Sequence, residues 1–428
     1  MKCVYWNIRG LGNDRARAHL RLLVNEIKPD FLCLAEPKIP VERCPSRYFS
    51  RIGLHPNVIA NRREDGAANL WFLWREGLPE PVVILSSSQH MTLQVKIQGV
   101  KSFVSVVHAS CLRAVRRDLW CDLASVAGVA CPWLVIGDFN AYLYASEKRG
   151  PGHFNQGSVE DFTAMVDLAS LTPIPSSGKK FTWSNNRRIG NVQAVLDRSF
   201  GNDAWWQQFE GCSQRVLVSG YSDHSPILVS CENLPRPPNV PFRFQRFWTK
   251  HDDFRSFVKD SWGEPVKGSP LFVVTKKLKR LKGPLRAWAR GAFPHIDHEI
   301  SRTKDHLHSI QKTIEEDGYS DALFDSEVSA KLSYNKAVEL QEKLWKEKAR
   351  DKWVKHSDRR TKYFHLSTKI RRALNAIREI KRDDGVSLKE TSSIADYFVS
   401  HFESFYKRGT VSSNADLIAD IPPPDHCI

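Results

Sequence analysis

A proline-rich break divides this chain into two parts of different character. Residues 234–241 read Leu-Pro-Arg-Pro-Pro-Asn-Val-Pro, and neither a helix nor a central strand accommodates prolines at this density. Residues 1–232 alternate short apolar runs with helical patterns, whereas the chain beyond the break consists of long charged stretches. We therefore predict a domain over 1–232, a linker over 233–247, a basic helical region over 248–410 and a disordered tail over 411–428.

The apolar pattern of the first part is typical of an α/β protein. Leu20, Leu23, Val24 and Ile27 are spaced as one face of a helix, and a second helical stretch covers about 113–130. Short apolar or alternating runs predict strands at Val4–Trp6, Phe31–Leu34, Met91–Ile97, Phe103–Val107, Trp133–Ile136, Phe181–Trp183, Val216–Val218 and Ile227–Val229. Many strands, few helices and frequent turns favour two sheets packed face to face with helices outside.

The second part is expected to be mainly α-helical. Its charged stretches predict helices over about 251–262, 271–290, 296–316, 322–369 and 391–406. The run Lys276–Lys282 has the pattern of a nuclear import signal, although an amphipathic helix gives the same pattern more often.

Charge points to a polyanionic partner. The formal net charge is +15. Residues 1–232 carry 26 Lys and Arg against 21 Asp and Glu, a net of +5, and the remainder carries 37 against 27, a net of +10. Such a balance suits nucleic acid, although basic residues also serve solubility.

The cysteines and the apolar runs predict an intracellular protein. Nine cysteines contain no Cys-x-x-Cys pair, which argues against a zinc cluster and a disulfide framework, so we expect reduced thiols. The N-terminus does not resemble a signal peptide, and no apolar run approaches the roughly 18 residues of a membrane span. We expect a nuclear or cytoplasmic protein with no membrane partner and no obligate protein partner.

Polar residues follow several of the predicted strands. Asn7 and Glu36 follow the first two strands, His108 and Asp138 follow later ones, and Asp223 precedes the last. Each of them alone has an ordinary explanation as a turn or cap residue. Together, on loops held by a rigid sheet, they suit an active site.

Six motifs in the first part resemble one family. They are Trp6-Asn7-Ile8-Arg9-Gly10-Leu11-Gly12, Leu34-Ala35-Glu36-Pro37-Lys38, Gly137-Asp138-Phe139-Asn140, Phe181-Thr182-Trp183-Ser184-Asn185-Asn186-Arg187, Leu196-Asp197-Arg198 and Ser222-Asp223-His224. Their order and spacing resemble the endonuclease/exonuclease/phosphatase superfamily, closest to the endonuclease domain of plant LINE-type non-LTR retrotransposon ORF2 proteins. The resemblance implies a four-layer α/β sandwich of the DNase I-like kind that cleaves phosphodiesters with Mg²⁺, or alternatively Mn²⁺.

The resemblance also implies a role for each site residue. Glu36 and Asp223 would bind the metal with help from Asn7, and Asp138 would orient and deprotonate the attacking water. The remaining catalytic residues would be Asn140, which holds that water or a phosphate oxygen, His224, which stabilises the transition state, Asp197, which orients His224, and His108, which contacts the phosphate. DNA contacts are expected from Arg9, Lys38, Trp183, Ser184, Asn186, Arg187 and Arg198.

Two positions depart from the family pattern. His108 stands where most relatives carry Tyr, and Val195 stands where these elements usually carry Arg. His108 still offers a hydrogen-bond donor, whereas Val195 removes a charge that would contact the substrate.

Beyond the break, the chain resembles the segment that precedes a retroelement reverse transcriptase. Pro241–Trp248, Leu344–Trp353 and Asp358–His365 carry this likeness, and no Tyr/Phe-x-Asp-Asp tetrad of a polymerase occurs. The stretch Lys343–Arg382 mixes fifteen Lys and Arg with aromatic residues, which suits RNA or DNA as well as a solvated helix.

We therefore expect a Mg²⁺-dependent DNA endonuclease from a truncated non-LTR retrotransposon. Two alternatives remain open. One is a catalytically inactive relic that binds nucleic acid, and the other is a different phosphoesterase or repair nuclease of the superfamily.

Overall fold

The computed structural model describes most of the chain. The described residues are 1–63, 68–152, 154–209, 211–232, 241–293, 296–318, 320–349 and 360–407. Contacts divide the chain into two compact units, Met1–Leu374 and Asn375–Ile428. Residues 233–240 of the expected linker and the expected tail over 411–428 lie outside the described residues, so the domain boundaries stay predictions.

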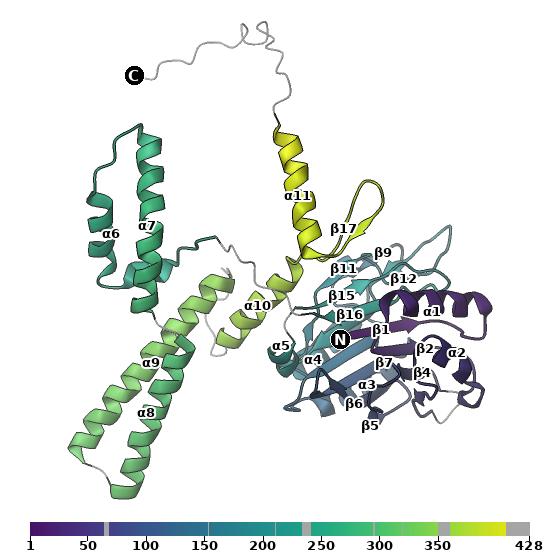
Figure 1. Ribbon diagram of the computed structural model, residues 1–428. Coiled ribbons are helices and arrows are strands. Elements are labelled where there is room, and N and C mark those ends of the chain that lie inside the picture. The colour runs from purple at the N-terminus through teal and green to yellow at the C-terminus, as the bar shows by residue number, and fades with distance from the viewer. Residues whose placement is uncertain are drawn as a thin grey trace, which may run out of the picture. The chain divides into compact units, whose positions relative to one another are not determined.

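Two large sheets form the first part of the chain (Figure 1). One has the strand order β11 (Ser176–Gly178), β15 (Cys212–Val216), β16 (Ile227–Cys231), β1 (Lys2–Asn7), β2 (Phe31–Ala35), β4 (Leu70–Trp74) and β3 (Ile59–Ala60). The other has the order β10 (Thr172–Pro173), β14 (Asp197–Gly201), β8 (Trp133–Asp138), β7 (Val100–His108), β6 (His90–Ile97) and β5 (Val82–Ser86). The expected DNase I-like sandwich is confirmed.

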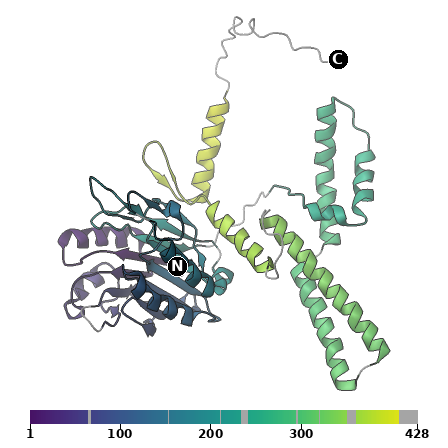
Figure 2. The ribbon, with the colours of Figure 1, turned by 180° about the vertical axis from the view of Figure 1, so that it is seen from behind.

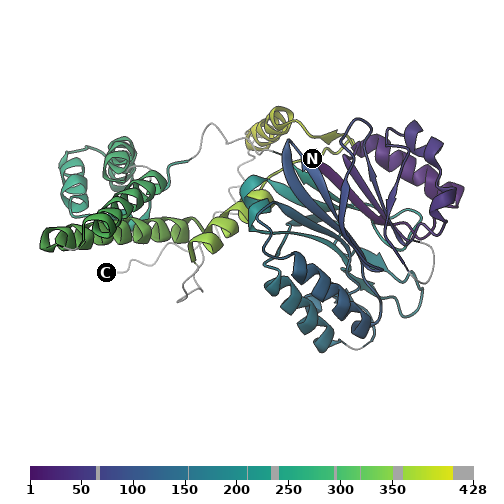
Figure 3. The ribbon, with the colours of Figure 1, turned by 90° about the horizontal axis from the view of Figure 1, so that it is seen from below.

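Helices cover both outer faces of this sandwich (Figure 3). The helices and short 3-10 turns of this part are α1 (Asp14–Ile27), η1 (Val41–Arg43), α2 (Ser46–Arg51), α3 (Arg113–Val126), η2 (Ala145–Glu147), α4 (Gln156–Leu168) and α5 (Asp203–Gln208). Alternation along β1 explains the layers, because Cys3 and Tyr5 lie in the core between the sheets while Val4 and Trp6 pack with α1. A third cluster joins α3 and α4 to the six-stranded sheet.

Most elements predicted from apolar spacing are confirmed. The predicted face of α1 is buried, and the Asn13 side chain caps this helix by accepting a hydrogen bond from the Arg15 N–H. Two predicted strands are shifted along the sequence. The strand predicted over Val216–Val218 corresponds to β15, which ends at Val216, and the strand predicted over Phe181–Trp183 corresponds to β12 (Trp183–Ser184), which begins at Trp183. β12 belongs to a small sheet with β13 (Gln193–Ala194) and β9 (Lys148–Arg149).

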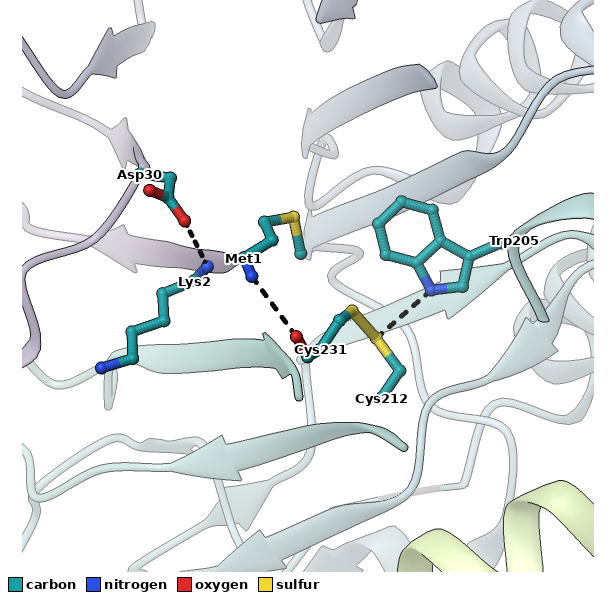
Figure 4. The surroundings of a disulfide bond; sticks show 6 residues. All are labelled: Met1, Lys2, Asp30, Trp205, Cys212 and Cys231. Atoms are coloured by element: carbon teal, nitrogen blue, oxygen red, sulfur yellow. Dashed lines mark hydrogen bonds between the residues drawn. A yellow bond between two sulfur atoms is a disulfide. The ribbon is translucent and has the colours of Figure 1, made fainter. Parts of the chain in front are cut away.

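Two cysteines correct the expectation of reduced thiols. Cys212 of β15 and Cys231 of β16 form a disulfide (Figure 4), because the antiparallel register places them opposite each other with a Cα–Cα distance of 4.1 Å. The Trp205 indole N–H lies 3.3 Å from Cys212 Sγ. The two cysteines are 19 residues apart in the sequence and form no recognisable motif. The bond can therefore be identified only from the pairing of the strands.

The helices of the second part follow the predicted ranges closely. They are η3 (Arg246–Lys250), α6 (Phe254–Gly263), α7 (Pro270–Ala292), α8 (Ile296–Asp317), α9 (Asp321–Ala349) and α10 (Arg360–Leu374). α8 and α9 run side by side in both views (Figures 1 and 2). The helix predicted over 322–369 corresponds to α9 and α10, with 350–359 outside the described residues.

The unit that begins at Asn375 contains a hairpin and a helix. The hairpin joins β17 (Ile380–Lys381) to β18 (Ser387–Leu388), and the helix is α11 (Thr391–Tyr406). Among the helices of the described ranges, none combines the length and the apolar character needed to cross a membrane.

Gly137 provides a test of the close strand packing in the six-stranded sheet. A Cβ at this position would lie 2.1 Å from the backbone oxygen of Val107 on β7, and neither backbone has room to shift. We expect Gly137→Ala to lower the free energy of unfolding of this domain by about 3 kcal/mol, measured by denaturant unfolding. Gly12→Ala is the control, because its Cβ meets Ile39 at an ordinary 3.6 Å. Equal stability of the two variants would contradict the packing described here.

Candidate active site

Five polar side chains meet at one edge of the two sheets. Asn7 ends β1 and Glu36 follows β2, which runs parallel to β1. His108 ends β7 and Asp138 ends the parallel strand β8, with the two residues paired in register. Asp197 begins β14 opposite Asp138. Because parallel strands end at the same edge of a sheet, this topology gathers residues that lie far apart in the sequence.

A buried chain of three ionisable groups lies at the centre of the site. Asp138, Asp197 and His224 are each at most 1% exposed. His224 Nδ1 lies 2.9 Å from Asp197 Oδ2, and His224 Nε2 lies 3.7 Å from Asp138 Oδ2. His224 comes from the loop between β15 and β16 of the seven-stranded sheet, whereas both aspartates belong to the other sheet. The predicted pairing of Asp197 with the His224 ring is therefore present.

The two carboxylates keep His224 protonated. Burial by itself lowers the pKa of His224, but the charges of Asp197 and Asp138 and the hydrogen bond that the ring donates to Asp197 outweigh it and raise the pKa to about 9. Burial raises the pKa of Asp197, opposed by the charge of His224. At neutral pH the ring is thus an imidazolium with both N–H groups directed at carboxylates.

The Asn7 side chain connects the three ionisable groups to Glu36. The Asn7 amide donates to Glu36 Oε1 at 3.1 Å and to Asp138 Oδ2 at 3.4 Å. Its carbonyl oxygen Oδ1 is buried and has no hydrogen-bond partner among the described residues. A buried oxygen without a donor favours a cation or an ordered water.

The carboxylates of Glu36 and Asp223 both form ion pairs with Arg9. Arg9 Nε lies 3.6 Å from Glu36 Oε1 and 3.1 Å from Asp223 Oδ1, and Lys38 Nζ lies 3.2 Å from Glu36 Oε2. Burial raises the pKa of Glu36, but hydrogen bonds from His108 and Asn7 and the charges of His108 and Arg9 lower it well below its usual range. The Glu36 and Asp223 carboxylates, which both contact Arg9, and the Asn7 oxygen together present the oxygen donors that Mg²⁺ prefers.

A second grouping also has metal-binding spacing. Asp138, Asp197 and His224 present ligand atoms within 4.8 Å of one another. A metal needs a ring nitrogen without its proton, and both nitrogens of His224 face carboxylates at a raised pKa. The protonated ring therefore disfavours a metal at this group, whereas the oxygen donors around Glu36 do not carry that cost.

Backbone and side-chain hydrogen bonds fix the remaining predicted residues. The Asn140 N–H donates to Asp138 Oδ1 at 2.9 Å, and the Asn140 amide donates to the Ala109 carbonyl at 2.7 Å. Trp183 Nε1 donates to Asp223 Oδ2 at 2.9 Å. Asn140 is thus positioned beside Asp138, and Trp183 orients Asp223 in addition to its predicted contact with DNA.

A chain of hydrogen bonds that the sequence did not suggest holds His108. Asn61 Oδ1 accepts from the backbone N–H groups of Asn69 and Leu70, which leaves the Asn61 amide to donate to Asn69 Oδ1 at 2.8 Å. The Asn69 amide then faces His108 Nδ1 at 2.9 Å. His108 Nε2 lies 3.4 Å from Glu36 Oε1. Asn61 and Asn69 flank a loop before β4 and belong to none of the recognised motifs.

An open cleft beside the site exposes it to a large substrate. The cleft has a volume of about 1290 Å³ and is lined by Arg9, Glu36, Asn61, Arg62, Arg63, Asn69, His108, Asp138 and Asn140, among others. Its walls combine polar and apolar groups and contain three arginines. The cleft opens onto the side of the site that carries Glu36, His108 and Asp138.

The predicted DNA contacts occupy different environments. Arg9 and Lys38 lie at the site, and Ser184, Asn186 and Arg187 lie on or beside the turn between β12 and β13. Arg198 is 7% exposed and its guanidinium pairs with Glu147 at 2.7 Å. Because Arg198 is buried and paired, we no longer expect it to contact DNA. Its ion pair instead stabilises the strand that carries Asp197.

The state of His224 is testable in the metal-free protein. We expect the His224 ring resonances to titrate near pH 9, measured by NMR in the presence of a chelator. Asp197→Asn removes the strongest opposing charge, so the pKa should fall well below that of the wild type, because burial then dominates. Asp223→Asn is the control. It should lower the pKa of His224 less, because the charge of Asp223 is the smallest of the named causes that shift this pKa. An unchanged pKa in Asp197→Asn would refute the assignment.

The hydrogen-bond chain through Asn69 predicts one tautomer of His108. Because the Asn69 amide can only donate, Nδ1 should be bare and Nε2 should carry the proton directed at Glu36. Long-range ¹H–¹⁵N spectra at mildly alkaline pH should show this pattern, with His108→Gln identifying the signal. Asn69→Ala should give a mixture of tautomers, whereas Asn57→Ala, on an exposed loop, should leave the spectrum unchanged. A proton on Nδ1 in the wild type would contradict the chain.

Comparisons with known proteins found one family model and several similar solved structures. A model of the Endonuclease/Exonuclease/phosphatase family matches residues 4–224. A comparison with curated proteins found no match. Among solved structures, similar ones include the 3'-5' exonuclease NExo from Neisseria meningitidis (16% identity, 54% of this chain and 100% of that chain, TM-score 0.43) and an AP endonuclease from Archaeoglobus fulgidus (14%, 54% and 100%, 0.44). The endonuclease domain of TRAS1, a telomere-specific non-LTR retrotransposon, is similar at 12% identity (53% and 96%, TM-score 0.40).

The family match spans just over half of the chain and contains every predicted catalytic residue. The chain therefore belongs to the endonuclease/exonuclease/phosphatase family.

Proposed function

We propose that this chain is a divalent-metal-dependent DNA endonuclease of non-LTR retrotransposon origin. The observation that carries the proposal is the buried chain Asp138–His224–Asp197 beside the Glu36 carboxylate. It combines a base, a fixed imidazolium and an anionic cation site at the edge of one open cleft. Each of the three contributes to hydrolysis of a phosphodiester, by proton transfer, stabilisation of the transition state and neutralisation of charge.

Asp138 supplies the proton acceptor. Water attacks phosphorus in line with the leaving oxygen, so one P–O bond forms as another breaks, and the water loses a proton. Asp138 takes that proton, and the Asn140 backbone N–H holds the carboxylate in position through its hydrogen bond to Oδ1. The protonated ring of His224 stabilises the negative charge that develops on the phosphoryl oxygens.

Glu36, Asp223 and the Asn7 carbonyl would hold the divalent cation, with Mg²⁺ the first candidate and Mn²⁺ the second. When bound, the cation neutralises charge on the phosphate and on the leaving oxygen. Arg9 and Lys38 now contact the same carboxylates. With those carboxylates engaged by a cation, Arg9 and Lys38 would be free to contact the DNA phosphates.

DNA is the proposed substrate because the chain is basic and its cleft is open. The net charge is +15, and the cleft contains Arg9, Arg62 and Arg63. Arg187 adds a cation beside the turn between β12 and β13. Similarity of the residues after the linker to a retroelement segment supports the proposed origin, and the basic stretch Lys343–Arg382 makes RNA a further proposed partner.

The test compares nicking of supercoiled plasmid with Mg²⁺, with Mn²⁺ and with chelator. We expect cleavage only with a divalent cation. Asp138→Asn should reduce the rate by ~10²–10⁴-fold through loss of the base. His224→Ala should reduce it by ~10²–10³-fold. The double variant should lose much less than the product, because both groups act on one step.

Asp167→Asn, which changes an exposed carboxylate on α4, is the matched control and should cut normally. Normal cutting by Asp138→Asn and His224→Ala would overturn the assignment of the site. A wild type that binds DNA and cuts nothing with either cation would instead establish the inactive alternative. Release of phosphate from small phosphoesters without nicking would favour a phosphatase.

A further inference from the structure

Helix α7 has two faces of opposite character. Leu281 and Leu285 are buried, and Trp288 packs with them against η3 and α6. The aromatic rings of Trp248 and Phe257 lie 6.4 and 5.6 Å from that of Trp288. This apolar contact fixes the rotation of α7 about its axis and therefore determines which side chains face solvent.

The solvent face of α7 carries a row of cations, which we call the α7 stripe. It consists of Lys276, Lys279, Lys282, Arg286 and Arg290, all exposed. Their spacing of three, three, four and four residues keeps them on one side of a helix. The helix contains no acidic residue at all.

Other cations of α7 have local roles, whereas the stripe is poorly neutralised. Arg280 pairs with Glu264 at 2.8 Å, and Lys277 donates to the Trp262 carbonyl. Lys276 and Arg286 lie over the rings of Phe272 and Phe242, contacts that leave their charge in place. Within the described ranges, no acidic side chain forms a salt bridge with Lys276, Lys279, Lys282 or Arg290. Like charges at these spacings repel, so the stripe favours an anionic partner.

We propose that the α7 stripe is a second DNA-binding surface, separate from the nuclease cleft, which takes the phosphate backbone of a duplex. From Lys276 to Arg290 the stripe extends about 21 Å at 1.5 Å per residue, and duplex DNA presents a charge every ~1.7 Å of its axis. Lysines and arginines on such a face contact phosphates without reading sequence.

The composition of the stripe distinguishes a duplex from a single strand. Single strands are held by aromatic side chains on which bases stack. Trp288 lies on the packed face, and the rings of Phe272 and Phe242 lie beneath the charged groups of Lys276 and Arg286. The choice of DNA over RNA rests on the proposed function. A second contact on the same chain raises the local concentration of DNA at the nuclease domain without adding specificity.

The test measures the salt dependence of duplex DNA binding by the full chain in the presence of chelator. The variant carries K276Q, K279Q, K282Q, R286Q and R290Q. If all five cations contact phosphates, the slope of log K against log salt should become shallower by about four units, since each contact contributes about 0.9. Circular dichroism should stay unchanged, because the apolar face of α7 is untouched.

The matched control removes five lysines from α8 and α9. It carries K304Q, K312Q, K331Q, K336Q and K343Q, and three of these lysines already pair with Glu316, Glu327 and Glu339. Its slope should stay near that of the wild type. Equal slopes for the wild type and the α7 variant, or equal losses in both variants, would overturn the proposal.

Two further arms separate the partner and the activity. Retained binding of duplex DNA by the α7 variant, together with loss of binding to duplex RNA, would overturn DNA as the partner. Because binding is measured without a divalent cation, a wild type that fails to nick plasmid contradicts the proposed function and leaves the result for α7 intact. A variant that keeps the wild-type slope contradicts the proposal for α7 alone.

Discussion

The Asp197–His224 pair is the interaction on which the rest of the site depends, because it joins the two sheets. Asp197 belongs to β14 of the six-stranded sheet, and His224 precedes β16 of the seven-stranded sheet. Both groups are almost fully buried, so removal of either partner leaves an uncompensated charge, which typically costs about 3–5 kcal/mol. The pair therefore fixes the distance between the sheets at the edge where Asn7, Asp138 and Glu36 meet.

A second constraint is the balance of charge around Glu36. Arg9 lies between the Glu36 and Asp223 carboxylates and Lys38 pairs with Glu36, so the two carboxylates lie close together without the repulsion that unpaired anions would feel. Arg9, Glu36 and Lys38 all have positive φ angles, a conformation that non-glycine residues adopt at a cost of about 1–3 kcal/mol. Backbone strain and paired charges concentrate in the same few residues, as expected for a functional site.

The sequence predicted most of the long strands and the strand-end residues, because apolar spacing and motif order are local properties, but it did not predict β4 or β5. It did not predict β14, whose residues Asp197–Gly201 are buried although they read as polar, since Arg198 pairs with Glu147 and Ser199 with Gln214 only after the sheets assemble. The same holds for Asn61 and Asn69, and for the Cys212–Cys231 bond, which depends on strand register. Contacts that satisfy buried polar groups arise from tertiary structure and leave no periodic pattern.

Positively charged side chains have different surroundings in the two parts of the chain. In the first part, cations near the site are paired with carboxylates, as Arg9 is with Asp223 and Arg198 is with Glu147. On α7 they accumulate on one face without acidic residues in the helix. Under the proposed function, a divalent cation would compete with Arg9 for its carboxylates and release it for DNA, whereas the α7 stripe would attract phosphate with or without that cation. The proposed division is therefore one of a site gated by the cation and a surface that binds without it.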